Sequence, residues 1–287
     1  MSVANFIPEV WAAVAEAELR KTLVYAQPGI INRNYEGEIA NQGDTVRINM
    51  IGPVTIGDYS KETAISAPEF LDSSQTTLVV DQSKYYNFAV DDIDMVQTKP
   101  KLMESFISQA QYGMADVIDQ YVAGLMEAAV PTANTIGTVA SPKDDLDTVT
   151  GAAYNYLVDL SVLLDNAKVP ASGRWAIVPP WVHGWLLKDD RFVKSGTPAG
   201  DAILRNGVVG EAAGFRVIKS VNVPNTSATK YKIIAGVDSA LTFASQLVKT
   251  EAYRPESYFA DAFKGLHVYG AKVVFPNRLA MLIANNS

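Results

Sequence analysis

The chain has 287 residues, of which 48% are hydrophobic and 19% charged, and its formal net charge at pH 7 is −7. These fractions are typical of an ordered globular protein, and the absence of cysteine excludes disulfides, thiolate nucleophiles, zinc knuckles and iron–sulfur clusters. Lys and Arg form no cluster, so no broad phosphate-binding surface is expected. No uncharged apolar run is long enough to span a membrane, and the first residues lack the pattern of a signal peptide. We therefore expect a soluble protein of the cytoplasm, or one assembled there, with no membrane partner.

The N-terminal part of the chain is predicted to be peripheral. Residues 8–25 should form a helix that begins at Pro8, and Pro28-Gly29 should end it. The apolar face of this helix, which includes Trp11, is narrow and rich in alanine. We therefore expect residues 1–42 to pack on another surface, such as a neighbouring subunit, rather than to form a core of their own.

A long two-stranded arm is predicted to follow. The stretch GDTVRINMIG, residues 43–52, alternates apolar and polar residues, as a half-buried strand does. Residues 53–74 are rich in Gly, Pro, Ser, Thr and Asp, and a second strand pattern brings the chain back over 75–90. The polar tip of the arm is expected near 58–68, and such a hairpin needs a partner surface to hold its shape.

One long helix is predicted between Pro100 and Pro131. Its apolar residues recur with the three-then-four spacing of a single helical face, and the two prolines mark its ends. A helix of about 30 residues is roughly 45 Å long, so we interpret it as a structural spine that lies along a sheet. The residues expected against that sheet are Phe106, Ile107, Val117, Ile118, Val122 and Leu125.

The remainder of the chain mixes helices and strands. A loop is expected over 131–145, a helix over 151–167, and a buried strand, RWAIVPP, over 174–180, with a short helix after it. Residues 207–220 indicate two strands joined by a glycine-bearing turn, and the chain from Tyr231 onward is rich in strands. This order of elements predicts an α+β protein without a βαβ repeat.

No set of residues indicates catalysis, a metal site or a cofactor. The chain has two histidines, His183 and His267, but no Gly-x-Ser-x-Gly motif that would supply the serine of a catalytic triad. The glycines between 207 and 214 lack the spacing of a phosphate-binding loop. The acidic run after residue 90 lacks the glycine and the terminal glutamate of a calcium-binding loop. We therefore expect packed or surface histidines, no enzyme activity and no cofactor.

The order of these elements resembles that of the major capsid (coat) proteins of tailed bacteriophages, which share the Hong Kong 97-like shell fold, and especially the coat subfamily of short-tailed phages. The stretches that carry the resemblance are GDTVRI, YYNFAVDDIDMVQ, the long helix, RWAIVPPWVHGWL, GVVGEAAGFRVIKSVNVP and GLHVYGAKVVFPNRLAMLI. The strongest single pieces are GDTVRI and the G-x-x-G-x-x-x-G-F-x-V turn before Val223-Pro224. The order and spacing of all the stretches together carry the resemblance.

This resemblance implies five regions along the chain. They are an N-terminal arm (1–42), an extended β-hairpin arm with its base (43–90), the spine helix of a peripheral domain (91–130), an axial domain (131–224), and the C-terminal strands of the peripheral domain with a return to the axial domain (225–287).

By the same resemblance, the chain would be a structural protein of the virion that assembles with itself, as hexamers and pentamers, into an icosahedral shell around double-stranded DNA. The chain has little room for a fused scaffolding segment, which implies a separate scaffolding protein beside a portal, and assembly in the host cytoplasm. A negatively charged wall would avoid holding the packaged DNA, which it would meet without sequence-specific binding. Contacts between subunits are expected at Trp11, Asp58, Lys61, Glu62 and Glu69.

Two alternatives remain open, and one modification is not expected. The first alternative is an encapsulin-type compartment, in which the same fold would enclose a cargo enzyme. The second is a soluble hydrolase or binding protein that uses acidic residues with His183. Some relatives cross-link their subunits through a lysine of the arm and an asparagine elsewhere, but no motif joins Lys61 to Asn277 in this chain, so covalent cross-linking is not expected.

Overall fold

The structure is a computed structural model, and it describes residues 23–35, 45–51, 56–62, 64, 67, 73–91, 102–146, 149, 151–189 and 210–286. Its helices are α3 (Leu102–Ala129), α4 (Ala152–Asn166) and α5 (Pro180–Lys188), with short 3₁₀ turns η3 (Thr132–Asn134), η4 (Asp238–Ala240) and η5 (Pro276–Arg278). Its strands are β1 (Thr45–Ile51), β2 (Ser73–Val79), β3 (Gln82–Asp91), β4 (Thr135–Ile136), β5 (Arg174–Val178), β6 (Glu211–Ala212), β7 (Phe215–Lys219), β8 (Asn225–Thr226), β9 (Lys230–Val237), β10 (Leu241–Tyr253), β11 (Ala260–Val273) and β12 (Leu279–Asn285). Among the described residues, no helix combines the length and the apolar character that crossing a membrane requires.

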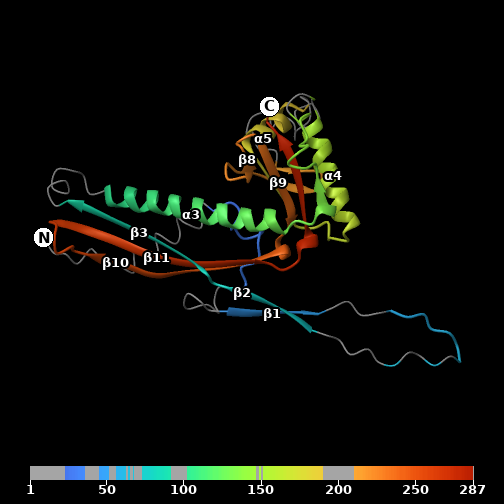
Figure 1. Cartoon of the computed structure of the whole chain (residues 1–287), viewed down its shortest axis with the longest axis horizontal. Helices are drawn as coiled ribbons and strands as arrows, with labels where there is room; N and C mark the ends of the chain where they lie inside the picture. Colours follow the sequence, from blue (N-terminus) through green and yellow to red (C-terminus); the bar gives the residue numbers. More distant parts are fainter. Residues whose placement is uncertain are drawn as a thin grey trace.

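The predicted spine helix is confirmed as α3, one unbroken helix that lies along a three-stranded antiparallel sheet in the order β10-β11-β3 (Figure 1). Ile118, Val122 and Met126 are fully buried in the main core. Nearer the start of the helix, Ile107 is buried with Phe263 of β11 in a smaller cluster. Because the apolar stripe recurs every three to four residues, one face of the helix stays on the sheet along its length.

One residue of the predicted buried face lies outside it, because Val117 is 40% exposed, and this part of the prediction is wrong. Phe106 is 43% exposed, but its ring lies 6.0 Å from that of Phe88 on β3, so it does lie against the sheet. The buried face is rotated toward Gln111 and Asp119, two polar residues that are almost completely buried. Periodicity assigns apolar side chains to the core, and it therefore cannot foresee a face that includes buried polar groups.

A seven-stranded sheet stands at the C-terminal end of α3, in the order β4-β12-β9-β5-β7-β6, with β8 paired to β9 (Figure 1). The helix predicted over 151–167 is confirmed as α4, which shares a buried cluster with α5 and this sheet. Arg174 of β5 is buried and binds Asp165 of α4 at 2.6 Å, so an ion pair joins strand and helix. Since β10 and β11 lie with α3 while β9 and β12 lie here, the chain passes between the two sheets at η4 and η5.

Residues 23–35 are part of the main core and not peripheral, which corrects the sequence prediction. Leu23, Tyr25 and Ile30 are buried in the same cluster as the sheet-facing side of α3. The predicted end of the first helix is also wrong, because residues 23–25 are not helical. The rest of that helix prediction, including Trp11, lies outside the described residues.

The predicted arm is present, but it is shorter than expected. β1 pairs with β2 in antiparallel register, from Thr45 opposite Val79 to Ile51 opposite Ser73, and the pair projects from the subunit (Figure 1). The return run, predicted as one strand over 75–90, is divided after Val79. Its second part, β3, pairs with β11 and is an edge strand of the three-stranded sheet. The return run therefore belongs half to the arm and half to the core sheet.

Two short pairings are not foreseen by the sequence prediction. The segment predicted as a loop over 131–145 holds η3 and β4, and β4 pairs in parallel with β12. Strand β8 pairs with β9 in the same sheet. A two-residue strand is too short to show any alternation, so these pairings come from tertiary contacts and have no sequence pattern.

Candidate assembly interface

The described tip of the arm, residues 56–62, exposes two large apolar side chains. Ile56 is 94% exposed and Tyr59 is 73% exposed. Scattered exposed apolar residues are common on proteins. Residues 56–62, however, lie at the end of a projecting arm, well away from the core of their own subunit (Figure 1). A second surface brought to this tip would remove both side chains from water.

The predicted contact residues fall into two groups. Asp58, Lys61 and Glu62 lie in the described tip and are all exposed, as an inter-subunit role would require. Glu62 has a φ of +69°, a left-handed conformation that is unfavourable for a residue with a side chain and that marks a tight turn. Trp11 and Glu69 lie outside the described residues.

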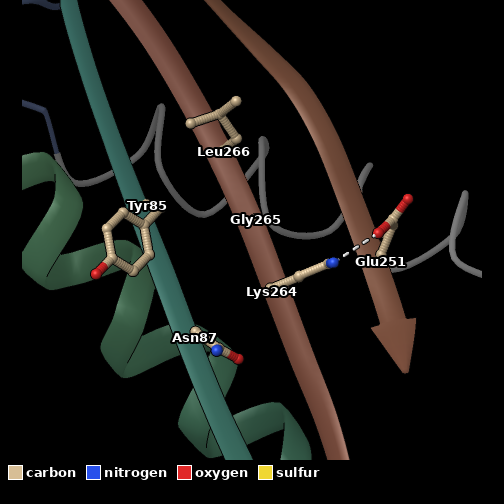
Figure 2. A pocket seen from close by; sticks show the side chains of 6 residues that line it. All are labelled: Tyr85, Asn87, Glu251, Lys264, Gly265 and Leu266. Atoms are coloured by element: carbon tan, nitrogen blue, oxygen red, sulfur yellow. Dashed lines mark ion pairs between the residues drawn. The ribbon is translucent and has the colours of Figure 1, made fainter. Parts of the chain in front are cut away.

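A hollow of about 300 Å³ lies on the three-stranded sheet, and its lining comes from three strands (Figure 2). Gly265 and Leu266 of β11 form its floor, and Tyr85, which is 78% exposed, stands over one side. Side chains alternate along a strand, so Tyr85 and Leu266 point away from the face that carries Phe88 and Phe263 toward α3. The hollow is therefore on the sheet face opposite the spine helix.

The polar rim of the hollow is made of groups that already pair with one another. Lys264 Nζ lies 3.0 Å from a carboxylate oxygen of Glu251 and 4.8 Å from the ring centre of Tyr253. The Tyr253 hydroxyl is 3.1 Å from the side-chain nitrogen of Asn87. The charges at the rim of the hollow are therefore compensated, and its floor is apolar. Such a hollow is better suited to an apolar or aromatic side chain with a polar edge than to a charged ligand.

The residues that make these two surfaces could not be identified from the sequence. Polar composition predicts the arm tip, but it does not single out the two apolar residues there, Ile56 and Tyr59. The signal for the hollow is weak: Tyr85 and Leu266 sit at outward positions of two strands, where an apolar residue is a mild exception to alternation. Only the pairing of β3 with β11 brings them side by side, because Tyr85 lies directly opposite Leu266.

Neither histidine lines the hollow or belongs to the arm tip. His183 on α5 is half-buried, and burial, together with the nearby positive charge of Lys219, lowers its pKa. His267 on β11 is buried beside the ring of Tyr269, and burial, with a smaller contribution from Arg33, lowers its pKa to about 4. A neutral, buried His267 is a packing side chain at neutral pH, in agreement with the sequence interpretation.

Within the described part of the chain, no group of three or more histidine, aspartate or glutamate side chains is placed to hold a metal ion. The described surface therefore offers an exposed arm tip and an apolar hollow, and both are suited to contacts between macromolecules.

Comparison with known proteins agrees with this arrangement. A family model described as phage capsid protein matches residues 75–283. A solved structure from Mycobacterium phage Che8 is 27% identical, covers 91% of this chain and 90% of its own, and superposes with a TM-score of 0.71. The capsid of cyanophage P-SCSP1u is 17% identical over 90% and 86% of the two chains, with a TM-score of 0.68. The holo-SrpI encapsulin complex of Synechococcus elongatus is 12% identical over 86% and 84%, with a TM-score of 0.50. The last two likenesses concern the fold alone, and no curated protein sequence matches the chain.

Proposed function

The chain belongs to the phage capsid protein family, and from this premise we propose that it is the coat subunit of a tailed-phage head. Copies of the chain would assemble as hexamers and pentamers into an icosahedral shell around double-stranded DNA. The observation that carries the proposal is the arm, which projects from the subunit and ends in the exposed Ile56 and Tyr59 (Figure 1). In an isolated subunit the exposed side chains at the end of such an arm stay in contact with water. In a shell they would be buried against a neighbouring subunit.

Among the described residues, the hollow over Leu266 is the receiving surface that we propose for that tip. The arm points away from its own three-stranded sheet in Figure 1, so the tip that enters the hollow comes from a second copy. The tip carries two exposed apolar side chains, Ile56 and Tyr59, among the charged residues Asp58, Lys61 and Glu62. The hollow offers an apolar floor beside the ion pair Lys264–Glu251, so each surface combines apolar and charged groups. Interfaces of this kind draw most of their binding energy from a few central apolar or aromatic residues.

We propose that each of the two sheets belongs to one of the two domains expected of such a subunit. The seven-stranded sheet with α4 and α5 is the proposed axial domain, and α3 with the three-stranded sheet is the proposed peripheral domain.

A separate scaffolding protein and a portal are proposed partners, with assembly in the host cytoplasm before the head becomes part of the virion. The subunit would act mechanically, without catalysis, cofactor or sequence-specific DNA contacts, and a net charge of −7 would keep its wall from binding DNA tightly.

The direct test is to express the chain alone and together with the scaffolding gene of its phage, and to examine the products by sedimentation and negative-stain microscopy. Closed particles of uniform size are expected. A stable small oligomer under both conditions would exclude the shell role.

A second experiment tests the contact at the arm tip. The double variant Ile56→Asp with Tyr59→Asp should abolish particles, and Ile56→Leu should retain them. Normal particles from the double aspartate variant would exclude the arm tip as a contact.

The encapsulin alternative is favoured by one observation, the shared fold, and the contents of the particles separate it from the phage role. Particles from infected or induced cells should absorb as nucleic acid and lose that signal on nuclease treatment after opening. Particles that instead carry a co-purified enzyme, and no DNA, would support a compartment.

A further inference from the structure

The return run of the arm crosses the three-stranded sheet at one point. Val79 is the last residue of β2 and pairs with Thr45 of the arm. Gln82 is the first residue of β3 and pairs with Tyr269 of β11. The extended chain therefore exchanges one partner strand for another within two residues, Val80 and Asp81. The direction of the arm is set at this exchange.

Beneath the crossing, the sheet presents almost no side chains. Gly270 of β11 lies directly opposite Ala244 of β10 in the strand register. A Cβ atom on Gly270 would overlap the carbonyl oxygen of Val79 and lie 2.9 Å from Cα of Val80. Both are backbone atoms, which cannot turn aside as the end of a side chain can. Glycine in a strand is typical of such a close approach between two backbones.

Apolar side chains on both sides of Gly270 hold the crossing in place. Val46 and Ile48 of β1, with Leu78 and Val80 of the return run, are buried against the sheet. Their partners from the sheet and its end are Ala244, Val268 and Val274. The base of the arm is thus pressed onto the sheet, and the distance of closest approach is set by the missing side chain of Gly270.

We propose that the Gly270–Ala244 pair, called here the saddle, fixes the angle at which the arm leaves the subunit and so positions the tip for assembly. The seven paired residues of β1 extend roughly 23 Å from the crossing, so a tilt of about 10° at the saddle moves the end of β1 by about 4 Å. A displacement of that size breaks van der Waals contact at the tip. The assembly part of this inference rests on the proposed function, whereas the angle itself is a property of the single subunit.

The angle can be measured in the isolated subunit. The chain has no cysteine, so Gln75→Cys on β2 and Ala128→Cys on α3 introduce the only two sites for spin labels, and both side chains are exposed. Pulsed electron paramagnetic resonance then gives the distance between arm and spine. Gly270→Ala should shift this distance by several ångströms or broaden it, leave the circular dichroism unchanged, and reduce closed particles at least tenfold. The matched control is Gly113→Ala, which adds the same methyl group into open space on α3 and should change neither distance nor assembly.

Each outcome decides a part of the proposal. An unchanged distance with normal particles for Gly270→Ala overturns it, and a shifted distance with normal particles overturns the link to assembly. If Gly270→Ala fails to fold, Val80→Ala loosens the same crossing without a clash, and it should broaden the distance and lower particle yield. A sharp, unshifted distance and normal yield for Val80→Ala would then reduce Gly270 to a packing role. If the wild-type chain forms no particles, the proposed function fails, while the distance measurement still tests the saddle.

Discussion

The carboxylate of Asp119 on α3 accepts the backbone N–H of Tyr25 at 3.0 Å, which joins the spine helix to a segment 94 residues earlier in the chain. The same carboxylate accepts the N–H groups of Val24 at 2.7 Å and Ala26 at 3.1 Å. Asp119 is only 2% exposed. A buried carboxylate is costly unless its charge is compensated, and here three backbone donors supply part of that compensation. This contact explains why residues 23–35 enter the core.

Asp119→Ala should therefore destabilise the subunit strongly. It leaves three buried backbone N–H groups without their acceptor, and each unsatisfied group costs about 1–3 kcal/mol, so a loss of about 3 kcal/mol or more is expected. Urea unfolding followed by circular dichroism measures the change. Asp116→Ala, three residues away and more exposed, is the control, and a change within about 0.5 kcal/mol is expected for it. Equal effects of the two substitutions would show that the Asp119 contact contributes little.

The pH dependence of stability should reveal two opposing groups. Burial is the main cause that raises the pKa of Asp119 from 3.8 to about 6, with Asp116 adding to the rise and the three hydrogen bonds opposing it. The folded state therefore binds the Asp119 proton more tightly than the unfolded state does. The contribution of Asp119 to the free energy of unfolding is then lost as the pH rises from about 4 to about 6. Burial lowers the pKa of His267 from 6.5 to about 4. The contribution of His267 to the free energy of unfolding is therefore lost as the pH falls over nearly the same range.

A pKa change of two corresponds to about 3 kcal/mol, so the two effects nearly cancel in the wild-type protein. Single substitutions should separate them. Relative to wild type, His267→Gln should become less stable as the pH rises from 4 to 6, and Asp119→Asn should become more stable. Urea unfolding at several pH values in this range gives both slopes, and the difference from wild type removes the contribution of the other carboxylates. Curves parallel to wild type would contradict both assignments.

The two faces of α3 can be compared with one substitution at adjacent positions. Ile118 is fully buried, whereas its neighbour Val117 is 40% exposed. Ile118→Asp places an unpaired charge in the core, which costs several kcal/mol, and soluble expression should stop. Val117→Asp should express normally and melt within a few degrees of wild type. If neither variant is expressed in soluble form, Val117 must be buried in the folded subunit.

The sequence predicts those elements whose pattern is local and long. The spine helix and α4 repeat their apolar residues often enough to be identified, β5 is identified by its unbroken apolar run, and the structure confirms all three. The split of the return run at Val80 has no such pattern, because it lies where the chain crosses Gly270, which is 190 residues further along the sequence. Burial of residues 23–35 depends in the same way on Asp119. Contacts between distant segments therefore account for the main corrections to the fold.

The candidate interface was predictable only in part. A run rich in Gly, Pro and polar residues indicates an exposed arm, and the exposure of Asp58, Lys61 and Glu62 agrees with it. The hollow could not be predicted in this way, because two side chains on the same face of β11, two residues apart, differ in their exposure. Val268 is buried under the base of the arm, whereas Leu266 is left open beside Tyr85. Which residues of a strand are covered depends on where the arm lies, and no local pattern records that.

The strand register also defines how the arm can be removed cleanly. Since Ile51 pairs with Ser73, a two-residue Asn-Gly turn between them closes the hairpin without changing the register of β1 and β2. The shortened chain lacks the tip but keeps Leu78 and Val80 against the sheet. We expect native circular dichroism, a melting temperature within a few degrees of wild type, and no closed particles by sedimentation or microscopy, even with scaffold supplied.

A second join provides the control for this shortened chain. Connecting Ile51 to Ser74 through the same turn shifts the register by one residue, which turns the buried side of β2 outward and should prevent folding. Failure of this chain, together with folding of the first, would show that the base of the arm belongs to the core and the tip does not. Normal particles from the first chain would remove the arm from assembly. Unfolding of the first chain would place the deleted residues in the core of the subunit. Only a folded subunit that forms no shell agrees with an arm whose tip binds a neighbouring copy.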